Sequence, residues 1–100
     1  MIDCCLNIFA PSGLEERVLD ALLAMEGTAI LVSSPAYAHG FAHGTLSTTE
    51  QVSGRSSATV IQLLIPESRL ALITSGLQQE LGRSDLRYWA TAVTHAGEFK

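Results

Sequence analysis

The sequence predicts an α+β fold in which a four-stranded sheet carries both helices on one of its faces. Strand-like and helix-like stretches follow one another in the order strand, helix, strand, strand, helix, strand. The 100 residues suit a single domain, residues 1–100. Hydrophobic residues make up 47% of the chain, which is enough apolar surface for one modest core.

The first strand is predicted over residues 3–9, a stretch rich in strand-forming side chains and followed by Pro11. Successive side chains of a strand point to opposite faces. The two faces therefore differ, with Leu6 and Ile8 on one and Cys5, Asn7 and Phe9 on the other. The adjacent thiols of Cys4 and Cys5 also point to opposite faces, so we expect no disulfide between them.

A helix is predicted over residues 14–25 because apolar residues recur there at helical spacing. Those residues are Leu14, Val18, Leu22 and Met25. Ser12 and Glu15 have the spacing of a capping box, in which each side chain accepts a hydrogen bond from the other residue's backbone N–H. Gly27 is placed to end the helix.

Residues 28–34 form a β-branched run that predicts the second strand, and Pro35 is expected to weaken that strand or to bend it out of a sheet interior. The third strand is predicted over residues 58–65, which are dense in Val, Ile and Leu. Residues 37–55, between them, have neither helical nor strand periodicity and predict a long loop. Because such loops are uncommon in small domains unless they are functional or disordered, we expect function to lie here.

The second helix is predicted to begin at Pro66 and to end at Gly82. Its apolar residues keep the helical period, namely Leu70, Ile73, Leu77 and Leu81. The fourth strand is predicted over residues 85–94. It places Tyr88 and Trp89 on opposite faces.

This order of elements is that of the ferredoxin-like βαββαβ sandwich. The face of the sheet away from the helices also carries apolar residues in this arrangement. Charged residues make up only 16% of the chain, against about 25% in an average domain. We therefore expect copies of the chain to cover that face by self-association.

The formal net charge is −4, and the six basic residues form no cluster. Because nucleic-acid-binding domains carry a basic patch or stripe, no nucleic-acid partner is expected. The first residues lack the basic segment of a secretory signal, and no apolar run approaches the length of about 18 residues that a membrane span needs. A cytoplasmic location is therefore expected.

His39 and His43 lie in the long loop, and each is followed by a glycine. On a helix their spacing would bring both imidazoles to one metal ion, but the glycines disfavour a helix. In an extended strand they would be about 13 Å apart. A shared site therefore needs a turn at Gly40 or ligands from neighbouring copies, and the alternative is two solvated histidines. His95, after the last strand, is either a surface residue or a ligand near a neighbouring copy's loop.

Glu50 and Arg55 place a carboxylate and a guanidinium on the same loop. Arg55 could bind a phosphate or carboxylate, or it could pair with Glu50. The chain contains no nucleophile elbow and no evident nucleophile–base pair, so we do not expect an enzyme. The strand over residues 58–65 also lacks the aromatic residues on which RNA-recognition domains stack bases.

A long loop between the second and third strands of a ferredoxin-like chain of this size resembles the PII signalling superfamily. The most specific likeness lies in five segments, His39-Gly40, His43, Leu46-Ser47, Glu50-Gln51-Val52-Ser53-Gly54-Arg55 and Tyr88-Trp89. In these segments the chain is similar to a PII-like family of unknown function whose genes often lie beside heavy-metal efflux pumps of the resistance-nodulation-division type. The resemblance covers nearly the whole chain.

The resemblance implies a PII-like homotrimer whose sheets line its centre. It also implies a cytoplasmic, non-enzymatic regulator or metal-responsive adaptor whose long loop senses small ligands and contacts a membrane transport protein. His39, His43 and Glu50 match polar positions of the family's loop. The chain differs from PII proteins in lacking their basic ATP-binding signature near the fourth strand.

The first functional hypothesis is metal sensing. His39 and His43 would bind a transition metal, copper, zinc or nickel, as neutral imidazoles. Glu50 or His95 would complete the site, and the protein would adjust a membrane metal-efflux transporter.

The second hypothesis is that the protein senses an anionic small molecule, such as a nucleotide, in clefts between subunits. Arg55 and Arg87 would anchor that anion. A trimeric adaptor that binds only another protein, with a loop that folds on binding, is the remaining alternative.

Overall fold

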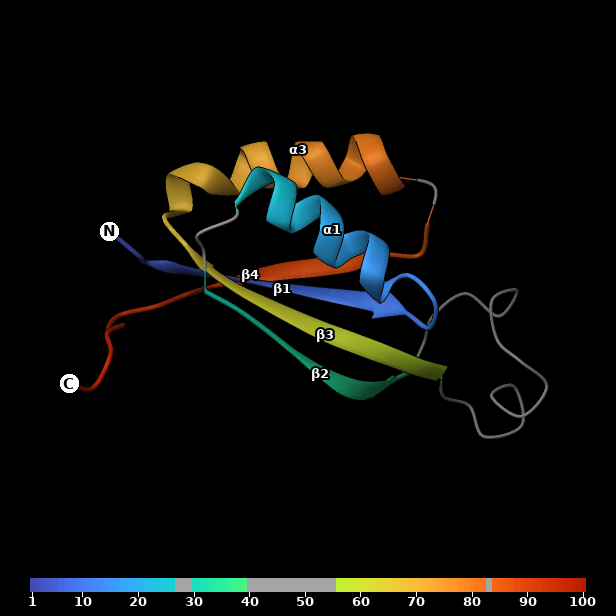
Figure 1. Ribbon diagram of the computed structural model, residues 1–100, viewed down its shortest axis with the longest axis horizontal. Coiled ribbons are helices and arrows are strands. Elements are labelled where there is room, and N and C mark those ends of the chain that lie inside the picture. The colour runs from blue at the N-terminus through green and yellow to red at the C-terminus, as the bar shows by residue number, and fades with distance from the viewer. Residues whose placement is uncertain (27–29, 40–55, 83) are drawn as a thin grey trace.

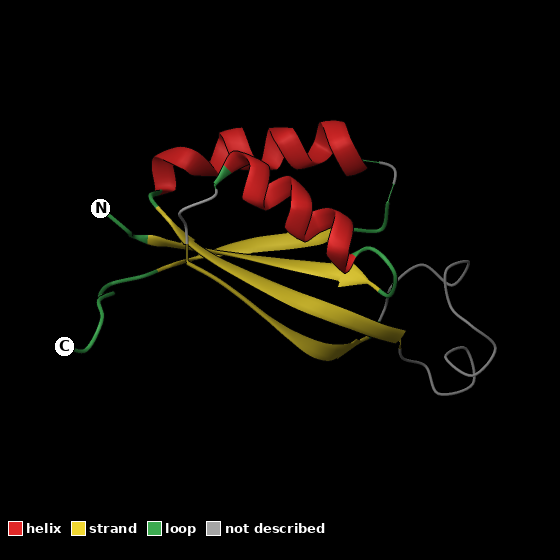
Figure 2. Ribbon diagram, viewed as in Figure 1, coloured by secondary structure: helices red, strands yellow, loops and turns green. Residues whose placement is uncertain are grey.

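A computed structural model describes residues 1–26, 30–39, 56–82 and 84–100. It has two layers, a sheet and a pair of helices that both lie on one of its faces (Figures 1 and 2). The order of elements and strands confirms the predicted ferredoxin-like βαββαβ fold. Within the described ranges, no helix is long and apolar enough to cross a membrane.

The elements along the chain are β1 (Cys4–Pro11), α1 (Glu15–Met25), β2 (Ile30–Ala38), β3 (Ser56–Ile65), the 3₁₀ turn η2 (Glu67–Arg69), α3 (Leu70–Leu81) and β4 (Arg87–Ala92). The strand order across the sheet is β2-β3-β1-β4, and every neighbouring pair is antiparallel. The strands β1 and β3 therefore form the centre of the sheet, whereas β2 and β4 form its two edges.

The core lies between the central strands and the helices. Leu6 and Ile8 of β1 are fully buried, which confirms the predicted division of this strand into two faces. The remaining large buried side chains are Val18 and Leu22 of α1, Ile61, Leu63 and Ile65 of β3, and Ile73, Leu77 and Leu81 of α3. The helical spacing predicted for both helices thus matches the side chains that they bury.

A close approach of the two helices depends on Gly76. A Cβ atom at this position would lie 2.5 Å from the Sδ atom of Met25, so the glycine makes room for that side chain on α3. Near the same end of α1, Arg69 and Glu26 form an ion pair with an Nη2–Oε1 distance of 2.6 Å. Together these contacts hold the end of α1 against α3 and the turn η2.

The expectation that Pro35 keeps the second strand out of the sheet interior is confirmed, because β2 is an edge strand, but the predicted end at residue 34 is wrong. β2 continues through Pro35, which lies opposite Thr59, and ends at Ala38. Because β2 is an edge strand, a residue without an N–H group is tolerated there. Tyr37 thus belongs to the strand, and most of the predicted loop, residues 40–55, lies outside the described residues.

The predicted capping box at Ser12 and Glu15 is also wrong. Leu14 occupies the N-cap position of α1 and makes no side-chain capping hydrogen bond. Glu15 instead accepts a hydrogen bond from the backbone N–H of Gly13, at 2.9 Å. Gly13 has a φ of +93°, a conformation that glycine adopts without steric cost. The turn between β1 and α1 is therefore set by Gly13.

Candidate functional site

The sheet face opposite the helices, which we call the open face, is the first candidate site. Its side chains come from all four strands, namely Cys5, Asn7, Phe9, Ile30, Val32, Ser34, Val60, Gln62, Leu64, Arg87, Trp89 and Thr91. Ile30, Val32 and Trp89 are each more than half exposed, at 55%, 54% and 56%. No described helix or strand covers this face (Figure 1). It is therefore a large apolar surface that the described part of one chain leaves in water.

A small hydrogen-bond network crosses the middle of the open face. Asn7 is only 7% exposed, and its Oδ1 accepts a 3.0 Å hydrogen bond from Nε2 of Gln62. Its Nδ2 donates to the backbone carbonyls of Cys5 and Trp89, at 3.2 and 3.4 Å. The Cys5 thiol makes a longer contact with Asn7 Oδ1, at 3.7 Å. Asn7 thus links β1 to both of its neighbouring strands.

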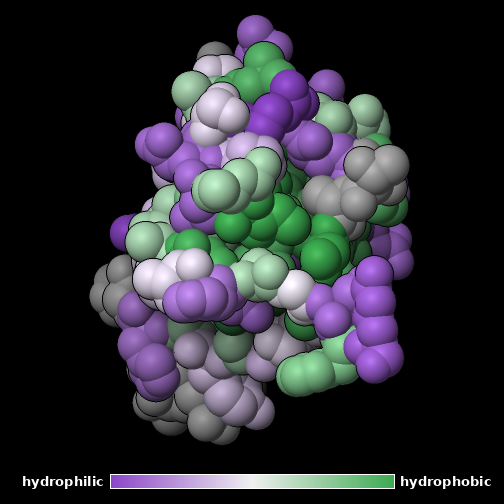
Figure 3. Space-filling view, turned by 90° about the vertical axis from the view of Figure 1, so that its left-hand side faces the viewer, coloured by the Kyte–Doolittle hydropathy of each residue, from purple (hydrophilic) through white to green (hydrophobic). Residues whose placement is uncertain are grey.

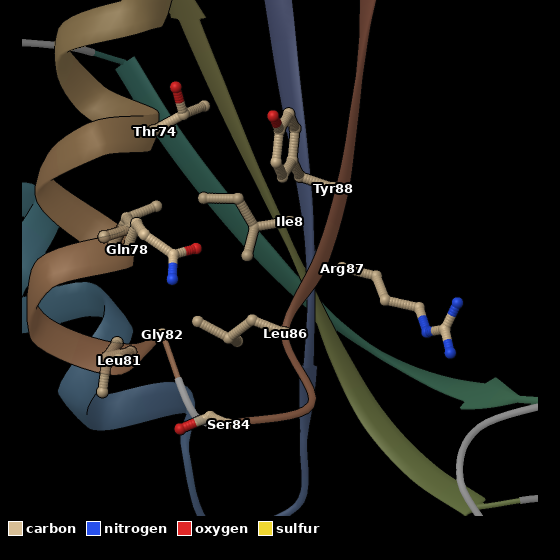
Figure 4. A pocket seen from close by; sticks show the side chains of 10 residues that line it. Ile8, Thr74, Gln78, Leu81, Gly82, Ser84, Leu86, Arg87 and Tyr88 are labelled. Carbon is tan, nitrogen blue, oxygen red and sulfur yellow. The ribbon is translucent and has the colours of Figure 1, made fainter.

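The second candidate is a pocket between α3 and β4. Side chains of Ile8, Leu86, Tyr88 and Gln78 converge on it, whereas Arg87 points away from α3 (Figure 4). Its volume is about 80 Å³, which is small against the roughly 300–1,000 Å³ of ordinary ligand sites. The described part of one chain therefore provides an apolar cleft with polar groups at its rim, and a larger ligand would need walls from elsewhere.

The end of the molecule that carries both termini also exposes apolar surface. A view onto this end shows a green, hydrophobic centre with polar groups around it (Figure 3). The final residues 93–100 leave the sheet without forming a further strand, and Phe99 is fully exposed. Exposed apolar groups are therefore found at this end as well as on the open face.

The structure places the predicted metal ligands His39 and His95 at opposite corners of the sheet. His39 follows the edge strand β2, and His95 follows the other edge strand, β4, which runs in the opposite direction. Both side chains are exposed, and Nδ1 of His95 lies 3.2 Å from Oγ1 of Thr94. These two histidines are thus not brought together within one chain. His43 and Glu50 lie outside the described residues.

Of the two predicted anion-binding residues, Arg55 lies outside the described residues and Arg87 begins β4. Arg87 is exposed and lies in register with Phe9 of the open face, so it is on the opposite side of the sheet from Tyr88. The predicted placement of Tyr88 and Trp89 on opposite faces is confirmed.

Within the described ranges, no group of three or more His, Cys, Asp and Glu residues could hold a metal ion. The pKa of the Cys4 thiol is raised, first by burial and then by the charges of Asp3, Cys5 and Glu67. Cys4 is therefore a protonated core thiol at neutral pH. It lacks the thiolate character that metal binding and nucleophilic attack require.

The sequence did not reveal the Asn7–Gln62 pair or the pocket beside α3. Alternation placed Asn7 on the face away from Leu6, but its partner lies 55 residues away along the chain. Finding that partner requires the register between β1 and β3, which no sequence pattern determines. The available signal was an amide in each of two mostly apolar strands.

Comparison with known proteins gives a family match over almost the entire chain. The family model described as "Protein of unknown function (DUF3240)" matches residues 2–100. A solved DUF3240 family protein from Shewanella baltica is 15% identical, with a TM-score of 0.78, and the match covers 100% of this chain and 99% of that one. A search of curated proteins finds no match.

Two further solved structures share the fold. The periplasmic divalent cation tolerance protein CutA from Archaeoglobus fulgidus is 14% identical, with a TM-score of 0.71, covering 97% of this chain and 89% of that one. The other is CPII, a nitrogen regulatory PII-like protein from Thiomonas intermedia whose structure is bound to ADP, AMP and bicarbonate. It is 13% identical, with a TM-score of 0.74, and the match covers 99% of this chain and 98% of that one. At these identities the likeness is one of fold.

Proposed function

The chain belongs to the DUF3240 family, and we propose that it is a small, non-enzymatic regulatory or adaptor protein of the PII-like kind that works as a homotrimer. The observation that carries this proposal is the open face. Its strands present Ile30, Val32 and Trp89 to solvent, and Arg87 is its one charged side chain among the described residues. Burying apolar surface contributes roughly 25 cal/mol per Å², so association through this face is favourable.

We further propose that the protein responds to a transition metal, copper, zinc or nickel. His39 supports this proposal because its exposed imidazole stands at the end of β2, where a metal can reach it. His43 and Glu50 would follow on the same segment. Because His39 and His95 lie at opposite corners of one sheet, a site that uses both would take His95 from a neighbouring copy.

Calorimetric titration of the protein with each metal ion tests this function. The proposal expects wild type to bind one of the ions at micromolar or tighter affinity and the His39→Ala/His43→Ala variant to lose that binding. His95→Ala tests whether the metal site needs the His95 imidazole. Gln79→His, on the exposed face of α3, adds a surface imidazole and controls for adventitious metal binding by such a group. Equal, weak binding by wild type and the double variant would refute metal sensing.

The protein partner in this proposal is a cytoplasmic portion of a membrane metal-efflux transporter. The support for it is the family resemblance of the His39-Gly40 and Glu50–Arg55 segments. A cytoplasmic location belongs to the same proposal, although the CutA protein of similar fold is described as periplasmic. Fractionation of cells that produce the untagged protein would test the location directly.

The alternative function is sensing of a nucleotide or another anion between subunits. Two observations favour it: the apolar pocket beside Tyr88, and the similarity of fold to CPII, whose structure is described as bound to ADP and AMP. The pocket is too small for a nucleotide in one chain, so a neighbouring copy would supply the remaining walls. Arg87 would bind the anion from the open face at the edge strand β4. Arg55, outside the described residues, would be the second cationic group that binds it.

Thermal-shift measurements with ATP, ADP and AMP separate the two functions. If a nucleotide binds, it raises the melting temperature because it stabilises only the folded state. Arg87→Ala should abolish that shift, while Arg17→Ala on the exposed surface of α1 should preserve it. No shift with any of the three nucleotides would rule out this alternative and leave the metal proposal intact.

A further inference from the structure

One row of the open face crosses all four strands and combines apolar and amide side chains. In register it contains Val32 of β2, Gln62 of β3, Asn7 of β1 and Trp89 of β4. The two amides occupy the central strands, and the two apolar side chains occupy the edges. The polar groups therefore lie in the middle of the face, where a covering partner would remove water most completely.

The two amides differ in how far their hydrogen-bonding capacity is used. Both N–H groups of the Asn7 amide donate to backbone carbonyls, and its Oδ1 accepts from Gln62 and from the Cys5 thiol. Gln62 uses only one N–H, toward Asn7. Its second N–H and its Oε1 have no further partner among the described residues, and the side chain is exposed. Asn7 thus holds the Gln62 amide through one N–H and leaves its second N–H and its Oε1 available to a partner.

This arrangement constrains any partner that covers the face. A buried amide without hydrogen-bond partners is destabilising, so the remaining N–H and the Oε1 of Gln62 must meet an acceptor and a donor when the face is covered. A charged partner would find only Arg87 as a counter-charge on the described part of this face. A second amide supplies both a donor and an acceptor. The amide of another Gln62 would therefore satisfy this one, so the face is chemically self-complementary at this residue.

We propose that Gln62 sets how copies of this chain pack, because its amide, held by Asn7, forms hydrogen bonds with the Gln62 amides of neighbouring copies around the symmetry axis. This inference rests on the proposed assembly through the open face. Its role resembles that of a single buried Asn in a coiled coil, which fixes register and the number of chains at some expense of stability. In this proposal the apolar contacts drive association, and the Gln62 amides determine in which register and number the chains associate.

Charge complementation tests the contact directly. Gln62→Glu and Gln62→Lys each place like charges against one another if the copies meet at this residue. Each variant alone should associate at least tenfold more weakly than wild type in sedimentation velocity at low salt. An equimolar mixture should recover part of that association, because a mixed trimer holds two attractive carboxylate–ammonium pairs and one repulsive pair, whereas each single-variant trimer holds three repulsive pairs. Gln79→Glu and Gln79→Lys, on the exposed helix face, provide the matched control and should associate like wild type.

A second variant tests selection of the arrangement. Gln62→Leu keeps the face apolar but removes the amide, so the chains should still associate but form a mixture of masses in native mass spectrometry. Two results together support the inference: recovery of association when the two charged Gln62 variants are mixed, and a mixture of masses for Gln62→Leu. If wild type forms one defined assembly and the charged Gln62 variants match the Gln79 variants, the inference is wrong while the assembly stands. If wild type itself stays monomeric, the proposed assembly fails and the inference fails with it.

Discussion

The rings of Phe9 and Trp89 lie against each other across β1 and β4, with their centroids 4.0 Å apart and their planes inclined by 32°. Trp89 is opposite Asn7 in the register and Phe9 is opposite Arg87, so the two rings are diagonal neighbours. Both belong to the open face. The pair therefore orders the large Trp89 side chain in advance, which in the proposed assembly lowers the entropy lost on association.

Trp89→Ala should weaken association of the chains. Large aromatic side chains in interfaces are typical hot spots, and their truncation costs about 2 kcal/mol or more, roughly thirtyfold in a dissociation constant. Sedimentation velocity across a dilution series measures the change. Tyr88→Ala is the matched control, since Tyr88 has similar exposure but lies on the other face. Equal effects of the two substitutions would contradict the assignment of the interface to the open face.

Asn7→Ala should lower the free energy of unfolding. The substitution removes the donors to the Cys5 and Trp89 carbonyls and the acceptor for Gln62, in a site that is almost fully buried. Leaving such groups unpaired costs about 1–3 kcal/mol. Urea unfolding at one fixed protein concentration measures this loss, and Gln79→Ala on the helix surface should change stability by less than about 0.5 kcal/mol. If Asn7→Ala leaves the free energy of unfolding unchanged, the hydrogen-bond network contributes nothing to stability.

Stability should fall in alkaline solution because of Cys4. Its pKa is raised in the folded state by burial, so above the ordinary thiol pKa of about 8.5 the unfolded chain loses this proton while the folded chain keeps it. The stabilising contribution is complete below that pH and is lost as the pH rises through the folded-state pKa. Urea midpoints between pH 7 and 10 should therefore decline more steeply for wild type than for Cys4→Ala. If the urea midpoints of wild type and Cys4→Ala decline in parallel with pH, Cys4 is not the cause of the alkaline loss of stability.

Gly13→Ala should destabilise the protein by about 1–2 kcal/mol. At a φ of +93°, any residue with a Cβ is strained, although no atom lies within 4 Å of that position. The expected loss is thus conformational rather than steric, and thermal unfolding measures it. Gly97→Ala, in equally open space at the end of the chain and without a positive φ, should leave the melting temperature unchanged. Equal melting temperatures for both variants would remove Gly13 as the determinant of the turn.

The apolar pattern of the sequence was enough to predict the fold. Leu6 and Ile8 share one face of the first strand by alternation, and Ile73 and Leu77 keep the helical period, so the buried side of each element could be predicted locally. The error in the end of the second strand, which was predicted before Pro35, has a tertiary cause. Whether a strand tolerates proline depends on its position in the sheet, and only the strand order shows that β2 is an edge strand.

The candidate site was less predictable because it depends on relations between distant segments. That His39 and His95 stand at opposite corners follows from the opposite directions of the edge strands β2 and β4, a relation between two strands that neither strand's own pattern contains. The roles of His43, Glu50 and Arg55, outside the described residues, stay predictions. The Asn7–Gln62 contact required the β1–β3 register, which is set by the packing of the whole sheet.

The molar mass of the wild-type protein in solution tests the central claim most directly. The claim is that copies of this chain cover the open face with one another. Multi-angle light scattering at micromolar concentration should give about 32 kDa, three times the 10.7 kDa of one chain, with less association for Trp89→Ala. A constant mass of 10.7 kDa up to the highest soluble concentration would contradict the account.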